Sequence, residues 1–247
     1  MKDNIKPPRG RNHIGLPPWR TKEKTCSKNK FLQSNSIKAI KFWDSFAGKF
    51  EVMTKFSEWR WSKPKEEIFS KATGKVLMVG AGTGNDFKFF PPNVKITAID
   101  FSPKMLNRAK TKIQNSPSPL ELKIEDVQTL SFEDESFDSS ITSCVFCSVP
   151  DPVKGLKEVY RVLKPGGNLA MFEHTDSKNP VLHLALKVMN FFPGPDLTRR
   201  TTQFVHDVGF EILEVNYIFQ DIVKTIYARK PGKIKAQHQK EHGKFEE

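Results

Sequence analysis

Three glycines at alternate positions, Gly80, Gly82 and Gly84, interrupt an apolar run in the segment VLMVGAGTGNDF. Glycine at position 80 permits a tight turn after a strand, and glycines at 82 and 84 leave no Cβ between the backbone and a ligand. A dinucleotide-binding fingerprint would need a glycine at position 85, where this chain has Asn85. The loop taken alone therefore indicates either a nucleotide-like ligand or a bare turn.

A carboxylate follows at the distance that a ribose-binding residue would need. Asp100 ends the apolar segment VKITAID, twenty residues after Gly80. A carboxylate at the tip of a second strand can accept two hydrogen bonds from a ribose diol. The alternative is that Asp100 only caps the helix that Ser102 and Pro103 begin. Together with the glycines, Asp100 favours an adenosine ligand.

The elements that must position these residues alternate between strands and helices. The strand segments are 75–79, 94–100, 119–125, 138–146 and 168–174, and the helical segments between them are 85–90, 102–114 and 152–163. This alternation predicts a parallel, doubly wound sheet in an α/β fold.

Further elements flank this alternation on both sides. Residues 36–60 carry apolar side chains at three- and four-residue steps, which predicts a helix ahead of the sheet. Segments 211–219 and 221–229 adjoin with no room for a crossover helix, so we expect an antiparallel pair. The turn between them should lie around Gln220 and Asp221.

Four segments, in order, resemble the class I S-adenosylmethionine-dependent methyltransferases of the ubiquinone/menaquinone-methyltransferase-like branch (methyltransferase type 11). They are VGAGTG (79–84), ITAIDFSPKML (96–106), EDVQTLSFEDESFD (125–138) and EVYRVLKPGGNLAMFEH (158–174). The resemblance covers about residues 40 to 229. It implies a Rossmann-like fold with a seven-stranded, mostly parallel sheet and an antiparallel C-terminal hairpin, which agrees with the reading of 211–229 from its pattern.

The resemblance also implies S-adenosylmethionine as cofactor and a role for each matched position. The glycines would approach the methionine part, Asp100 the ribose, Met105 or its neighbour the adenine face, and Asp126 with the Val127 amide the adenine edge. The expected cofactor-binding residues are Gly80, Ala81, Gly82, Gly84, Asp100, Phe101, Met105, Asp126, Val127 and Cys144.

Two positions depart from the family's pattern. The family usually has an acidic residue two positions before the first glycine, where it helps to hold the methionine amino group, and this chain has Met78. Three consequences of this missing acid are open. Asp86 could supply the acceptor instead, the cofactor could bind more weakly, or the chain could be a degenerate member of the family. In the helix before the sheet, Phe50 and Glu51 stand where the family often has tyrosine and aspartate. Packing over the cofactor is retained there, without the phenol hydroxyl.

Methyl transfer from a sulfonium needs alignment of a nucleophile and exclusion of water, so no metal or catalytic triad is expected. Cys144 and Cys147 have no second thiol pair, and we interpret them as core or pocket-lining residues. His174 ends strand 168–174, near where a substrate should approach, and could accept a proton as a catalytic residue. Its alternative is a hydrogen-bonded histidine at a strand end.

The acceptor is less constrained than the cofactor. The first half of segment 181–200, VLHLALKVMNFFPGPDLTRR, is a helix with few polar residues, which suggests a lipophilic substrate, membrane contact or ordinary core packing. Together with other segments it resembles methyltransferases that act on alkyl thiols, with phospholipid and quinone methyltransferases close behind. A nucleic-acid methyltransferase and a non-catalytic S-adenosylmethionine-binding protein stay open. Against the former, CVFCSVPDP follows the fourth strand where base-amine methylating members have N/D-P-P-Y/F.

Charge and composition set the domain boundaries. Residues 1–31 carry nine basic and two acidic residues, 229–247 carry six and three, and the rest carries 25 and 23. We therefore expect basic, disordered tails at 1–31 and 230–247 around a methyltransferase domain at 32–229. The tails would solubilise the chain or contact an anionic membrane or nucleic acid, with nucleic acid disfavoured. The charged, proline-broken N-terminus and the absence of a long apolar run predict a cytoplasmic protein, either free or peripheral to a membrane. The sequence leaves its oligomeric state open.

Overall fold

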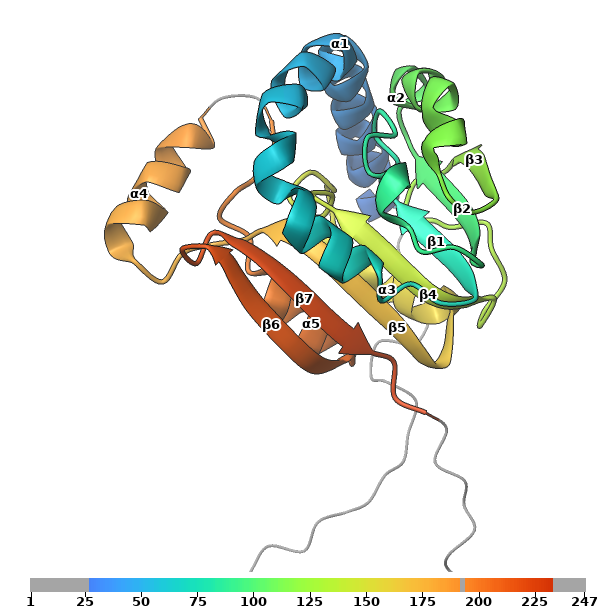
Figure 1. Ribbon diagram of the computed structural model, residues 1–247. Coiled ribbons are helices and arrows are strands. Elements are labelled where there is room, and N and C mark those ends of the chain that lie inside the picture. Colours follow the sequence, from blue (N-terminus) through green and yellow to red (C-terminus); the bar gives the residue numbers. More distant parts are fainter. Residues whose placement is uncertain (1–26, 192–193, 233–247) are drawn as a thin grey trace, which may run out of the picture.

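The computed structural model describes residues 27–191 and 194–232 of the 247-residue chain (Figure 1). Most of the two predicted tails lies outside these described residues. At both edges the folded unit extends past the predicted boundaries. The first helix already begins at Ser27, and Lys230 is buried, with its Nζ donating to the carbonyls of Tyr160 and Leu163 at 2.8 and 2.6 Å.

A seven-stranded sheet forms the centre of the molecule, in the order β3-β2-β1-β4-β5-β7-β6. The strands are β1 (Lys75–Val79), β2 (Lys95–Asp100), β3 (Leu120–Ile124), β4 (Phe137–Ser143), β5 (Leu163–His174), β6 (Glu211–Phe219) and β7 (Val223–Arg229). The first five pair in parallel, and β7 pairs antiparallel with both β5 and β6. The predicted α/β fold class and the C-terminal antiparallel pair are confirmed.

Both faces of the central strands are buried, as a parallel sheet requires. Leu77 and Val79 of β1 pack in one apolar cluster with α3 (Pro152–Val162) and α5 (Thr201–Val208). Val76 and Met78 pack on the opposite face, in a second cluster with the end of α1 (Ser27–Phe69). Apolar residues at successive positions of β1 therefore serve two separate cores.

Three helices begin with the same local signal, a polar cap followed by proline. Ser102 precedes α2 (Pro103–Ala109), Asp151 precedes α3, and Asn179 precedes α4 (Pro180–Met189). In each case the cap side chain accepts a hydrogen bond from a first-turn amide, and the proline lacks the N–H that would be left unbonded there. The predicted helix 102–114 ends sooner than expected, because residues Lys110–Asn115 tighten into a 3-10 helix, η3.

Two expectations about helices need correction. The predicted helix at 85–90 is only a 3-10 turn, η2 (Phe87–Phe89), so no α-helix N-terminus faces the ligand from the glycine loop. The eight-residue α5 was not anticipated, because its sequence, TTQFVHDV, combines β-branched and polar residues over barely two turns.

The long helix α1 covers the carboxyl end of the sheet. Figure 1 shows it passing over the top of the molecule before its C-terminal part descends to the sheet, where Phe69 is fully buried. Ion pairs hold it to the body: Lys65 binds Asp86 at 2.8 Å, and Glu51 binds both Arg108 and Lys112, the latter at 2.6 Å. None of the described helices is both long and apolar enough to cross a bilayer.

Candidate functional site

A cavity opens beneath α1 at the carboxyl ends of β1, β2 and β4, with about 730 Å³ of space including its mouth. Eight of the expected cofactor residues lie on its wall: Gly80, Gly82, Asp100, Phe101, Met105, Asp126, Val127 and Cys144. Segments far apart in the sequence thus meet where the alternating pattern placed them.

The three glycines of the loop have different surroundings. All three glycines have positive φ, but a Cβ on Gly80 would lie 2.3 Å from Val145, and a Cβ on Gly84 would lie 2.8 Å from Phe87. Around Gly82 there is no described heavy atom within 4 Å of that position. Gly80 and Gly84 therefore leave room for protein packing, and Gly82 leaves open space. For Gly84 this replaces the expected approach to a ligand.

Ala81 also lies off the cavity wall. Its side chain is buried, and its amide donates to the Ile99 carbonyl at 2.8 Å, next to the equivalent bond from Gly80. These two bonds continue the β1–β2 pairing into the loop. Ala81 consequently supports the shape of the site from behind.

The Asp100 carboxylate is held by two backbone amides. One carboxylate oxygen accepts from the Gly82 amide and the other from the Ser102 amide, both at 2.9 Å. The side chain is buried, and this burial raises the pKa of Asp100 to about 6, while the two amide bonds oppose the rise. Each oxygen keeps a lone pair for a ligand hydroxyl. Asp100 thus holds the loop and can bind a diol with the same group.

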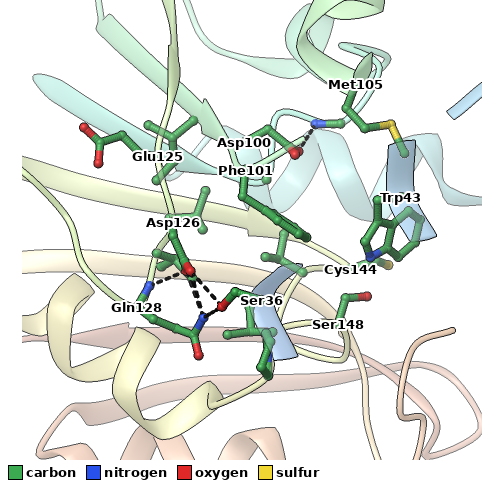
Figure 2. A pocket seen from close by; sticks show the side chains of 18 of the residues that line it. Ser36, Trp43, Asp100, Phe101, Met105, Glu125, Asp126, Gln128, Cys144 and Ser148 are labelled. Carbon is green, nitrogen blue, oxygen red and sulfur yellow. Dashed lines mark hydrogen bonds between the residues drawn. The ribbon is translucent and has the colours of Figure 1, made fainter. Parts of the chain in front are cut away.

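At the far side of the cavity, Asp126 belongs to a polar cluster that sequence reasoning only partly found. Its carboxylate accepts from the Gln128 amide at 2.9 Å and from the Ser36 hydroxyl at 3.1 Å, and the Gln128 side chain bonds to both (Figure 2). Ser36 comes from α1, 90 residues away in sequence. No local signal marks Ser36, whereas Gln128, two residues after Asp126, has the spacing of a turn that an aspartate closes.

The remaining wall beneath α1 is aromatic. Trp43 and Phe50 both line the cavity, with their ring centroids 5.7 Å apart in an edge-to-face arrangement. Phe50 therefore lies where the expected packing over the cofactor would place it. Trp43 belongs to the predicted apolar stripe, and only the fold shows that this part of the stripe faces the cavity.

The end of β4 is shaped by a buried carboxylate that was not anticipated. One oxygen of Glu173 accepts from the Thr142 hydroxyl at 2.8 Å and the Val145 amide at 3.1 Å, and the other has no hydrogen-bond partner in the described part of the chain. Burial raises the pKa of Glu173 to about 7. Cys144, in a left-handed conformation with φ 54°, begins the loop that Glu173 fixes. Burial raises the pKa of the Cys144 thiol to about 12, so this wall residue stays a neutral thiol.

His174 lies beside this loop but is not one of the residues that line the cavity. The Cys147 thiol of this loop donates to the Cys144 carbonyl at 3.4 Å, and burial raises the pKa of this thiol. No group of three or more His, Cys, Asp or Glu side chains in the described residues is arranged to hold a metal ion.

The cavity has no carboxylate from position 78, which is Met78, and the carboxylate of Asp86 is bonded elsewhere. Met78 is buried in the apolar cluster beneath the sheet, and both oxygens of Asp86 accept from Lys65 Nζ, at 2.8 and 3.0 Å. On this side the wall offers the hydroxyls of Ser143 and Ser148. The replacement of the usual acid by Asp86 is therefore not supported by its position.

Comparison with known proteins identifies this arrangement. A family model described as a methyltransferase domain matches residues 77–171. A thiol S-methyltransferase of Homo sapiens is 30% identical over 203 residues, which cover 72% of this chain and 79% of the human protein. The chain belongs to the methyltransferase-domain family.

Other members of this methyltransferase family match over shorter stretches. A second human thiol S-methyltransferase is 38% identical over 50% of this chain, and a phosphatidylethanolamine N-methyltransferase of Cereibacter sphaeroides is 37% identical over 41%. These matches span only 55% and 51% of the two relatives. Among solved structures, an S-adenosylmethionine-dependent methyltransferase from Aquifex aeolicus shares the fold with a TM-score of 0.58, at 20% identity over 74% of this chain and 98% of its own.

The cofactor of this methyltransferase family is S-adenosylmethionine, as the sequence predicted. The residues present fit it: the open space at Gly82, the acceptor oxygens of Asp100 and the aromatic wall of α1 suit a small, flat adenosine with a polar sugar. The fit is weakest for the methionine amino group, because the usual acidic acceptor is absent.

Two glycine variants should separate packing from ligand contact. We expect Gly82→Ala to fold, with a cost of about 1–2 kcal/mol for its left-handed backbone, and to bind S-adenosylhomocysteine at least about tenfold more weakly. Gly84→Ala should be less stable by roughly a further 1–3 kcal/mol, because its methyl group meets Phe87 and the Ala109 backbone. Thermal unfolding and calorimetric titration measure the two effects. Equal stability of the variants, or full affinity in Gly82→Ala, would contradict this division.

The affinity for S-adenosylhomocysteine should fall as the pH drops through about 6. Burial raises the pKa of Asp100 to about 6, so below that pH the carboxyl is protonated and loses acceptor capacity for the ribose hydroxyls. Asp100→Asn should weaken binding by about 1–3 kcal/mol at pH 7.5 and flatten the profile across this window. Circular dichroism of each variant controls for folding. A wild-type profile that the substitution leaves unchanged would exclude Asp100 as its source.

Proposed function

We propose that this chain transfers the methyl group of S-adenosylmethionine to a small, apolar or lipid-like acceptor. The observation that carries the proposal is the cavity itself, in which a polar cradle, Gly82 with Asp100, faces an aromatic wall, Trp43 with Phe50. The cradle suits the sugar of the cofactor, and the apolar wall suits a site that excludes water. Expulsion of water strengthens the polar interactions that remain inside.

The bound cofactor would supply a methyl group on a positively charged sulfur, which an aligned nucleophile can attack without further activation. We assign ribose binding to Asp100, the adenine edge to Asp126 with Val127, and the adenine face to Phe101 and Met105. Glu173 fixes the loop that begins at Cys144, and so sets the shape of the wall at the end of β4. Alignment of the acceptor by this loop would be the chain's main contribution to the rate.

A thiol is the acceptor we favour, with a phospholipid amine and a quinone-type carbon as alternatives. The human relative that this chain covers over 79% of its length is named as a thiol S-methyltransferase. A thiol must lose its proton to attack efficiently. We propose that His174 receives it, since His174 ends β5 beside the loop after β4, and other residues of that loop line the cavity.

Two other functions make different predictions. A nucleic-acid methyltransferase would need a basic surface, but the basic excess of the sequence lies in the terminal segments, while residues 32–228 carry 25 basic and 23 acidic residues. A binding protein without turnover is a further alternative, and a [4+2]-cyclase, SpnF, that shares the fold at a TM-score of 0.56 shows that this fold serves other chemistry too.

An acceptor panel tests the proposal. Purified protein with S-adenosylmethionine should form S-adenosylhomocysteine when given an alkyl thiol, and more slowly or not at all with phosphatidylethanolamine, a demethylquinone or RNA. We expect the rate with the thiol to rise with the length of the alkyl chain, because the wall is apolar. Binding of the cofactor without product on any acceptor would favour the non-catalytic alternative.

The variant His174→Asn tests whether His174 is the proton acceptor. It should lower turnover of the thiol by about 100-fold while the affinity for S-adenosylhomocysteine stays within about twofold. Restoration of the rate at high pH, where a thiol ionises without help, would support a base at this position. A variant as active as the wild type would return His174 to a purely structural role.

A further inference from the structure

Helix α4 presents an unusual outer face. Four exposed apolar residues follow one another at three- and four-residue steps, which places them in one stripe along the helix, and exposed Met189 lies beside them. Val181 is 74% exposed, Leu184 62% and Val188 54%, and Phe191, just beyond the helix, is 88% exposed. A surface helix normally turns polar residues outward, so this outer apolar stripe has the opposite pattern.

The inner face of α4 already has its partners. His183 Nδ1 bonds to Asp176 at 2.6 Å, Leu186 is buried, and Asn190 donates to Asp196 at 2.8 Å and to Thr198 at 3.1 Å. These contacts fix the rotation of the helix about its axis. The apolar stripe therefore cannot be buried by rolling α4 toward the body without breaking them.

Hydrogen bonds also fix the start of α4. Asp221 accepts from the Ser177 hydroxyl and from the Lys178 amide, both at 2.6 Å, and the Asn179 side chain caps the first turn. Figure 1 shows α4 in orange, projecting at the side of the body with open space around its outer face. The helix is thus a fixed projection rather than a loose flap.

The exposed charges along the stripe are basic. Lys178 and Lys187 are exposed, and the Arg200 side chain is 77% exposed. Between residues 177 and 191 there is no acidic residue. The acids near the two ends of the helix are engaged: Asp176 with His183 and Arg200, Asp196 with Arg199, and Asp221 with Ser177 and the Lys178 amide. An apolar stripe with basic side chains along it is complementary to an anionic lipid surface.

The loop after α4 connects the stripe to the cavity. The Asp196 amide donates to the Cys147 carbonyl at 2.8 Å, and Arg199 donates to the carbonyls of Phe146 and Val149. Cys147 and Phe146 belong to the loop that follows β4, and Val149 of this loop lines the cavity. A surface that binds α4 would therefore lie near a segment that is hydrogen-bonded to the cavity-lining loop after β4.

We propose that α4 docks this protein onto an anionic lipid bilayer, with Val181, Leu184, Val188 and Phe191 inserted at the headgroup boundary and Lys178, Lys187 and Arg200 at the phosphates. A bilayer fits this projecting, narrow, basic-flanked stripe, whereas a protein partner would need a groove shaped to receive it. The docking does not depend on methyl transfer and can be measured without cofactor or acceptor.

Vesicle co-sedimentation of the full chain tests this. Vesicles of phosphatidylcholine with about a third phosphatidylglycerol should retain the wild type, and vesicles of phosphatidylcholine alone should retain much less of it. The double variant Leu184→Asp/Val188→Asp should bind the anionic vesicles at least about tenfold more weakly. Lys187→Glu should weaken binding to a smaller extent, and about 0.5 M NaCl should remove that difference.

Leu213→Asp is the matched control, because Leu213 is 43% exposed on the edge strand β6, away from α4. It should bind vesicles like the wild type. Each variant is checked by its affinity for S-adenosylhomocysteine, which should not change, since α4 contributes nothing to the wall of the cavity. Cofactor binding would thus report a failure of the proposed function separately from a failure of docking.

Two outcomes would overturn the proposal. Undiminished vesicle binding by the double variant would assign the lipid affinity to the basic terminal segments instead of α4. A wild type that ignores vesicles and is dimeric by light scattering, with the double variant monomeric, would assign the stripe to a second copy of the chain.

Discussion

The site depends on one buried carboxylate. Asp100 accepts hydrogen bonds from Gly82 in the glycine loop and from Ser102 at the start of α2, so one side chain at the tip of β2 fixes the elements on both sides of it. Burial of a charge without partners would be very costly, and these two amides are what make its position tolerable. The remaining acceptor capacity of Asp100 faces the cavity. The group that stabilises the loop is therefore the same one that we propose to bind the ribose diol.

The second half of the site comes from a helix outside the sheet. α1 contributes Trp43 and Phe50 to the cavity wall and Ser36 to the carboxylate of Asp126, and its far end is buried against the sheet at Phe69. Ion pairs from Lys65 and Glu51 hold it to the loop that follows β1 and to η3. Because the ligand space lies between α1 and the sheet, the helix can cover the bound cofactor and exclude water at once.

Much of this could be predicted from the sequence, and the failures have physical reasons. Apolar segments predicted the strands, and their alternation with helical segments predicted the parallel sheet, because buried strands and capped helices are locally encoded. The order of the strands in the sheet was not predicted. Asp100 and Gly82 were predictable since their roles follow from spacing along one βαβ unit. Ser36 and Glu173 were not, because their contacts join residues far apart in the chain. Gly84 was assigned to the ligand because a sequence cannot show whether a missing Cβ faces a cavity or a phenylalanine ring.

Calorimetric titration with S-adenosylhomocysteine, with NADH as the comparison, tests the central claim most directly, because the cavity is defined by its cofactor before any acceptor is known. The structure predicts micromolar binding of S-adenosylhomocysteine at pH 7.5 and no binding of NADH, since the loop lacks the third glycine of a dinucleotide site and Asn85 stands in its place. Absence of S-adenosylhomocysteine binding would contradict the account. Met78 would then mark a lost site, and the methyltransferase fold would stand without its activity.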